Sequence, residues 1–190
     1  MKHPSAHRAF LTILALNVLV YVLGFFVSAF PDALAMSVTD SWPMLAAHMV
    51  TCMFAHAGFW HIFGNMFFVT PFALYLEPKI GSTKFLAYWL LTGLGASTLF
   101  LATPALFGWT SCLGASGACF GIATLALAHV DEHRLWVYLA LALMLLLTWP
   151  EYANTVMGFL LPSGVAHSAH LGGFLTALLI KSKDCGCSLQ

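Results

Sequence analysis

Long runs of apolar residues, separated by short polar connections, make up most of the chain. Apolar stretches of this length, nearly free of charged side chains, are typical of helices that cross a lipid bilayer. Six are predicted, of which the last two are short: about 9–30, 58–76, 85–103, 113–130, 135–150 and 165–180. The pattern indicates an all-α membrane protein in which residues 1–190 form one domain, a bundle of six transmembrane helices.

The connection between the first two helices, residues 31–57, is longer and more apolar than an ordinary loop. It carries Pro31, Asp32, Asp40, Trp42 and Pro43. A connection of this composition is predicted to lie partly in the membrane interface.

The first apolar run has an alternative interpretation as a signal peptide. Lys2 and Arg8 precede it, and Ala33-Leu34-Ala35 resembles a cleavage site. The run has about 20 residues, whereas the apolar part of a signal peptide has about 7–15. A retained first helix is therefore the preferred interpretation.

Composition supports the membrane interpretation, and the basic residues give an orientation. The chain is 61% hydrophobic and 7% charged, with a mean hydropathy of +0.89, whereas about a quarter of the residues in a soluble domain are charged. Cytoplasmic connections are enriched in lysine and arginine. All seven basic residues fall at the two termini or in the second–third and fourth–fifth connections: Lys2, Arg8, Lys79, Lys84, Arg134, Lys181 and Lys183. Both termini are therefore predicted to be cytoplasmic, in a multi-pass protein of a bacterial inner membrane.

With this orientation, polar residues from three distant helices reach a similar depth on the outer side of the membrane. Polar groups at such depth are costly in hydrocarbon and normally face the bundle interior or a water-filled cavity. The residues are His56, His61, Asn65, Ser116, His167 and His170. Their convergence predicts a polar site inside the bundle.

The residue types in this set suit nucleophilic catalysis. A serine hydroxyl needs an adjacent base, which a neutral histidine supplies, and a buried carboxylate as third member would be costly. The Asn65 amide, His61 and the Ser116 backbone N–H are candidate donors to a tetrahedral oxyanion. Gly114 and Gly117 allow the backbone to approach the serine closely. The glycines and small residues around Ser116 are also what a plain contact between two helices would show.

Four motifs in order give the chain a family resemblance. They are "HAGFWHIFGN" (His56 to Asn65), "EPKIGSTKF" (Glu77 to Phe85), "GASG" (Gly114 to Gly117) and "AHLGG" (Ala169 to Gly173). Together, over about residues 45–180, the chain resembles a rhomboid intramembrane serine protease of the basic six-helix form.

The resemblance implies an enzyme that cleaves transmembrane segments of membrane proteins near the outer face by a Ser-His dyad. It implies Ser116 as nucleophile, His170 as general base, and Asn65 and His61 with the Ser116 N–H as oxyanion hole. It further implies residues that line or shape the site: His56, Gly114, Gly117, Phe120 and Gly173. The expected partners are transmembrane protein substrates and the bilayer, and no cofactor, metal or nucleic acid is expected.

The chain departs from the family pattern at two places. Ala47-His48 stands where the family usually has Trp-Arg, so the packing of the first connection stays open. Ala177 replaces a common glycine, although Gly173 and Ala177 still form a face of small residues for close helix approach.

Several alternatives remain open from the residues alone. His167, three residues before His170, could serve as the base. A catalytically inactive rhomboid-like protein would bind transmembrane helices in the same groove without the dyad. A multi-histidine metal or haem carrier would need paired histidines in facing helices, whereas this set mixes histidine with serine and asparagine. His129 and His133 have the spacing of a metal pair, although a solvated helix end explains them more simply.

The spacing of the five cysteines does not indicate a disulfide framework. Cys52 and Cys112 could pair if both faced an oxidising compartment. Cys185 and Cys187 in the tail could be acylated or remain thiols.

Overall fold

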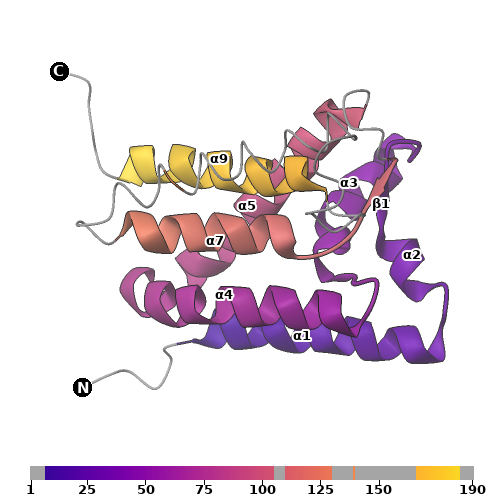
Figure 1. Cartoon of the computed structure of the whole chain (residues 1–190), viewed down its shortest axis with the longest axis horizontal. Helices are drawn as coiled ribbons and strands as arrows, with labels where there is room; N and C mark the ends of the chain where they lie inside the picture. Colours follow the sequence, from indigo (N-terminus) through magenta and orange to yellow (C-terminus); the bar gives the residue numbers. More distant parts are fainter. Residues whose placement is uncertain (1–6, 105–109, 130–138, 140–165, 185–190) are drawn as a thin grey trace.

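The structure is a computed structural model, and it describes residues 7–104, 110–129, 139 and 166–184. Its described part is predominantly helical, and the long helices pack side by side (Figure 1). These long helices are α1 (Arg8–Phe26), α4 (Phe59–Ile80), α5 (Ser82–Ala102), α7 (Ser116–Ala128) and α9 (His167–Asp184). The shorter α7 lies in the middle, in contact with α4, α5 and α9.

The short elements gather at the end of the bundle where α1 ends and α4, α7 and α9 begin (Figure 1). They are α2 (Phe30–Leu34), β1 (Met36–Ser37), α3 (Trp42–Thr51), the 3-10 turn η1 (Cys52–Phe54) and β2 (Ser111–Cys112). The two strands pair antiparallel, with Met36 opposite Cys112 and Ser37 opposite Ser111. The first connection is therefore attached to the segment that leads into α7.

Three of the described helices are long and apolar enough to cross a membrane, namely α1, α4 and α5. The helix predicted over 113–130 is present but begins later, at Ser116, and α7 is shorter than these three helices. The helix predicted over 135–150 lies outside the described residues, except for Leu139. The described bundle agrees with a helical membrane protein.

The first predicted helix and the connection after it differ from the prediction. The helix predicted over 9–30 ends at Phe26, and the residue after it, Val27, is extended. The predicted loop 31–57 instead contains α2, β1, α3 and η1. Pro31 and Pro43 lie in the first turns of α2 and α3, where a missing N–H costs nothing and the fixed φ favours a helix. The prolines therefore start two helices in this segment.

Small residues let α7 and α9 approach each other closely. A Cβ on Gly173 would collide with the backbone carbonyl of Gly117, and a Cβ on Gly117 would collide with the side chain of Ala96 on α5. Ala177, one helical turn after Gly173, is fully buried. Close backbone contact of this kind is how helices associate when no hydrophobic effect drives them together.

Glu77 links α4 to the beginning of α1. The helix predicted over 58–76 continues to Ile80, so Glu77 lies inside it and is only 1% exposed. Its carboxylate accepts hydrogen bonds from the backbone N–H groups of Ala9 and Phe10, both at 2.9 Å, and from the Ser82 hydroxyl at 2.6 Å. The first N–H groups of a helix have no intrahelical acceptor and carry a partial positive charge. Glu77 therefore caps α1 from a neighbouring helix.

Replacing Glu77 with glutamine is expected to destabilise the bundle. The amide can accept from one N–H group of α1, but its own NH₂ then faces the other donor. Loss of a hydrogen bond to a charged group costs about 1.5–3 kcal/mol. Thermal unfolding in detergent measures the change, and Asp32→Asn, which removes an exposed carboxylate on α2, is the control. Equal unfolding temperatures for wild type and Glu77→Gln would contradict the capping role.

Candidate active site

Ser116 is the first residue of α7, directly after a tight turn. Gly114 has φ +121°, a conformation that residues with a side chain rarely adopt. Its N–H donates to the Cys52 carbonyl at 2.8 Å, which fixes the turn to η1. Because the first N–H groups of a helix lack intrahelical acceptors, Ser116 lies among backbone donors at the positive end of α7.

A cavity of about 400 Å³ opens beside Ser116, between α4, α5, α7, α9, η1 and the turn from β2 to α7. This turn, residues 113–115, is called the β2 turn. Residues expected from the sequence to form the site share its wall: His61, Asn65, Gly114, Ser116, Gly117 and His170. Three separate helices thus contribute the serine, the two histidines and the amide. The sequence placed these groups at a similar depth, and the structure brings them to one cavity.

Aromatic packing fixes the His170 ring. It stacks on Phe120, with ring centroids 4.5 Å apart and an interplanar angle of 29°, and Phe120 in turn contacts Phe68 at 5.0 Å. Phe120 lies one helical turn after Ser116, so the same face of α7 carries both side chains. The serine and the histidine are therefore held on adjoining helix faces.

His170 and Ser116 make no hydrogen bond within the described part of the chain, where the buried Nδ1 of His170 also has no partner. Catalytic hydrogen bonds are often long before substrate binds and shorten in the complex. His167 packs edge-on against His170 at 5.4 Å and is buried, but it is not among the described residues that line the cavity. Of the two histidines of α9, His170 thus lines the cavity and His167 does not.

His56 holds Asn65 and the turn before Ser116 in place. Its Nε2 accepts from Asn65 Nδ2 at 2.9 Å and from the Ala115 N–H at 3.4 Å, while its Nδ1 donates to the Phe54 carbonyl at 3.4 Å. Burial, followed by the nearby His61, lowers the pKa of His56 to about 4, so the ring stays neutral and keeps its acceptor at neutral pH. The sequence included His56 in the site but could not show these contacts.

Gly114 brings the backbone next to the two candidate oxyanion donors. A Cβ at this position would lie 2.7 Å from His61 Nε2 and 3.7 Å from Asn65 Nδ2. The rings of His56 and His61 are 5.0 Å apart, edge to face. Glycine is therefore required at position 114 both by the turn and by the nearby side chains of His61 and Asn65.

Sequence reasoning missed part of the wall. Cys52 and Ser97 line the cavity, and the Ser97 hydroxyl donates to the Met49 carbonyl at 3.1 Å. Neither residue belongs to a spaced motif, so no sequence signal marked them. Cys112 also lines the cavity, and no disulfide joins it to Cys52 in this structure.

The two histidines with the spacing of a metal pair, His129 and His133, are not brought to the cavity by the described structure. His129 follows α7, and its ring bonds the Leu125 carbonyl one turn earlier at 2.7 Å. His133 lies outside the described residues. Within the described residues, no three histidine, cysteine or acidic side chains gather as a metal site would require.

Comparison with known proteins places this arrangement in a family. A model of the rhomboid domain matches residues 44–186. The chain belongs to the rhomboid family. The rhomboid match covers β2, η1 and every helix that contributes to the cavity, whereas α1, α2 and β1 precede it.

Individual rhomboid relatives share about a third of their matched residues with the chain. RHOMBOID-like protein 5 of Arabidopsis thaliana is 30% identical over 138 residues, covering 70% of this chain and 42% of the relative. RHOMBOID-like protein 2 of the same plant is 34% identical over 134 residues, covering 70% and 40%. Rhomboid-like protease 3 of Toxoplasma gondii is 31% identical over 135 residues, covering 70% and 49%.

The chain spans less than half the length of these rhomboid relatives. Family membership and the apolar helices make it an integral membrane protein. The relatives come from a plant and from Toxoplasma, so they do not support the bacterial inner membrane expected from the sequence.

Proposed function

We propose that this rhomboid-family chain is an intramembrane serine endopeptidase that cleaves transmembrane segments. The observation that carries the proposal is the shared cavity, which is lined by Ser116 at the start of α7 and by His170, Asn65 and His61 from two other helices. Ser116 is the proposed nucleophile and His170 the general base. Asn65, His61 and the Ser116 N–H are the proposed oxyanion donors.

In this mechanism the Ser116 oxygen attacks the scissile carbonyl while His170 takes the hydroxyl proton. Negative charge develops on the carbonyl oxygen, where preorganised donors lower the barrier. His170 then gives the proton to the leaving amine, which leaves an acyl-enzyme on Ser116. Water attacks the ester with His170 again as base, and the acid product departs. The stack on Phe120 holds the imidazole in one orientation throughout these steps.

The proposed membrane setting has six spans with both termini in the cytoplasm and the cavity toward the outer face. In this orientation Lys79 and Lys181 lie on the cytoplasmic side, which cysteine labelling at these two positions from each side of the membrane would test. A substrate helix must unwind before its carbonyl can be attacked, because a helical backbone is hydrogen-bonded to itself. Substrates with helix-weakening residues near the outer surface therefore fit the site best.

A second candidate function is binding of transmembrane helices without cleavage. The family and the apolar helices are equally compatible with it. Retention of a serine, a histidine and an amide on one cavity favours catalysis, because a binding groove has no need of this set.

The deciding experiment uses the full chain in proteoliposomes with a model transmembrane substrate tagged at both ends. Peptidase activity predicts two tagged fragments and labelling of the protein by a serine-directed fluorophosphonate. If the substrate can be crosslinked to the protein but stays intact, and no label is incorporated, the binding function replaces the proposed one.

Substitution of Asn65 with alanine tests the oxyanion hole. Removing one donor typically costs about 10²–10³ in rate, and we expect the lower end because His61 and the Ser116 N–H remain. A lost transition-state contact lowers kcat and leaves KM nearly unchanged. The measurement is kcat, KM and unfolding temperature together. A fall in stability with unchanged kcat per folded molecule would make Asn65 structural, through its bond to His56.

A further inference from the structure

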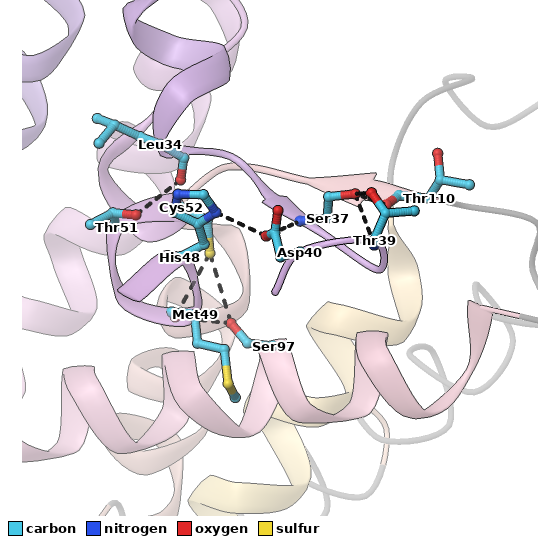
Figure 2. A network of polar contacts seen from close by, with 10 residues as sticks. All are labelled: Leu34, Ser37, Thr39, Asp40, His48, Met49, Thr51, Cys52, Ser97 and Thr110. Atoms are coloured by element: carbon cyan, nitrogen blue, oxygen red, sulfur yellow. Dashed lines mark hydrogen bonds and ion pairs between the residues drawn. The ribbon is translucent and has the colours of Figure 1, made fainter. Parts of the chain in front are cut away.

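Asp40 and His48 form a polar contact outside the cavity that the proposed mechanism does not use. Asp40 Oδ2 accepts from the Ser37 N–H at 2.8 Å and pairs with His48 Nδ1 at the same distance (Figure 2). Both side chains are mostly buried, with relative exposures of 14% for His48 and 11% for Asp40. They are the only titratable side chains between residues 33 and 51.

This one carboxylate oxygen closes a ring of contacts around the nucleophile's turn. On one side, His48 belongs to α3, which continues into η1, where the Cys52 carbonyl accepts from the Gly114 N–H. On the other side, Ser37 belongs to β1, which pairs with β2 just before Gly114. Both routes from the Asp40–His48 pair therefore reach the turn that positions Ser116.

Further bonds make the ring rigid. The Ser37 hydroxyl and the Val38 N–H both donate to the Thr110 carbonyl, at 3.2 and 3.0 Å. The Thr51 hydroxyl donates to the Leu34 carbonyl at 3.1 Å (Figure 2). Movement of α3 away from β1 would therefore be transmitted to the β2 turn and not absorbed locally.

The carboxylate of Asp40 is the charged partner in this contact. The Ser37 N–H, followed by His48, holds the pKa of Asp40 below its ordinary value of 3.8, so the carboxylate is ionised at neutral pH. Hydrogen bonds to an ionised acceptor are stronger than those between neutral groups. The His48 ring therefore has an acceptor that holds it in one place.

We propose that Asp40 and His48 are positioning residues: their contact holds α3 against β1 and so keeps the β2 turn and Ser116 in place. Loss of one hydrogen bond of this kind corresponds to about a two- to ten-fold change in an equilibrium.

Other ionisable groups around the pair are few. Asp32 lies on α2 and is exposed, and Cys52 lies on η1. Cys112 is the titratable residue of β2, and β1 has none. On α5 the titratable side chains, Lys84 and Tyr88, are at its beginning, more than two turns before Ser97, which contacts Met49 of α3. Asp40 is therefore the charge that His48 meets directly.

The test is a double-mutant cycle of Asp40→Asn and His48→Ala, and it rests on the proposed peptidase activity. The kcat and KM for a model transmembrane substrate are measured in proteoliposomes. We expect each single variant to lower kcat by about two- to ten-fold with little change in KM, because the nucleophile is displaced and the substrate-binding surface is not. The double variant should lose no more than either single variant, because both changes remove the same contact. His48→Gln, which keeps a donor, should restore most of the activity.

Two further measurements complete the design. His129→Gln removes a histidine at the far end of α7 and should show the wild-type kcat. The unfolding temperatures of the same variants report on the contact without any activity. Unchanged kcat in both single variants, or losses that add in the double variant, would overturn the proposal. If no variant cleaves substrate, the proposed function fails while the unfolding temperatures still decide the pairing.

Discussion

Replacement of Ser116 with alanine is expected to abolish cleavage of a transmembrane substrate while leaving the protein folded. Alanine fits the beginning of α7, because Ser116 is followed by tightly packed small residues and contributes no hydrogen bond to the described core. Without the hydroxyl no acyl-enzyme can form. Loss of the nucleophile in a soluble serine protease costs roughly 10⁶ in kcat, so activity should fall below detection. Cleavage in proteoliposomes and fluorophosphonate labelling measure the result.

Thr98→Ala is the matched control for Ser116→Ala. Thr98 is exposed on α5, and its hydroxyl bonds only the Leu94 carbonyl one turn earlier. This variant should retain both cleavage and labelling. Cleavage that persists in Ser116→Ala at the wild-type rate would end the assignment of the nucleophile, and with it the proposed mechanism.

Replacement of His170 should reduce turnover by about 10²–10⁴-fold, the usual contribution of a positioned base. The same change at His167 should leave most activity, because the described cavity wall includes His170 and not His167. Matched preparations of the two alanine variants, assayed for kcat and unfolding temperature, give the comparison. The opposite ranking would show that His167 is the base.

Packing must be separated from proton transfer in this comparison. His170→Ala leaves a gap beside Phe120, and a gap alone can loosen α7. His170→Gln fills most of that space without providing a base. An inactive His170→Gln protein of near wild-type stability would attribute the loss to chemistry, whereas recovery of activity in His170→Gln would attribute it to packing.

Hydropathy predicted the existence of the described long helices because burial in lipid is a local property of each segment. Their ends depend on partners far away in sequence. Glu77 extends α4 because the N–H groups at the start of α1 compensate its charge, and no pattern near residue 77 shows this. The folding of residues 31–57 likewise depends on a strand paired about 75 residues later, with Met36 opposite Cys112. Such contacts are visible only in three dimensions.

The sequence predicted more of the candidate site than of the fold around it. The spacing of His61 and Asn65 puts both on one helix face, and the alternation of basic loops put Ser116 and His170 at the same end. The role of His56 could not be found in this way, because its three partners come from η1, α4 and the turn before α7. His48 showed no usable pattern in the sequence, because its pairing with Asp40 depends on the fold of the loop.

The shortness of α7 sets the depth of Ser116 in the proposed membrane setting. Its 13 residues give a helix about 20 Å long, about 10 Å less than the hydrocarbon core of a typical bilayer. In the proposed membrane setting, with the end of α7 at one membrane surface, Ser116 lies well below the other. The proposed hydrolysis would then require water to reach Ser116 through the cavity, and the scissile bond of a substrate to move to the same depth. In the proposed mechanism, the length of α7 thus sets the depth of cleavage, and the thickness of the surrounding bilayer selects which peptide bonds of a substrate reach that depth.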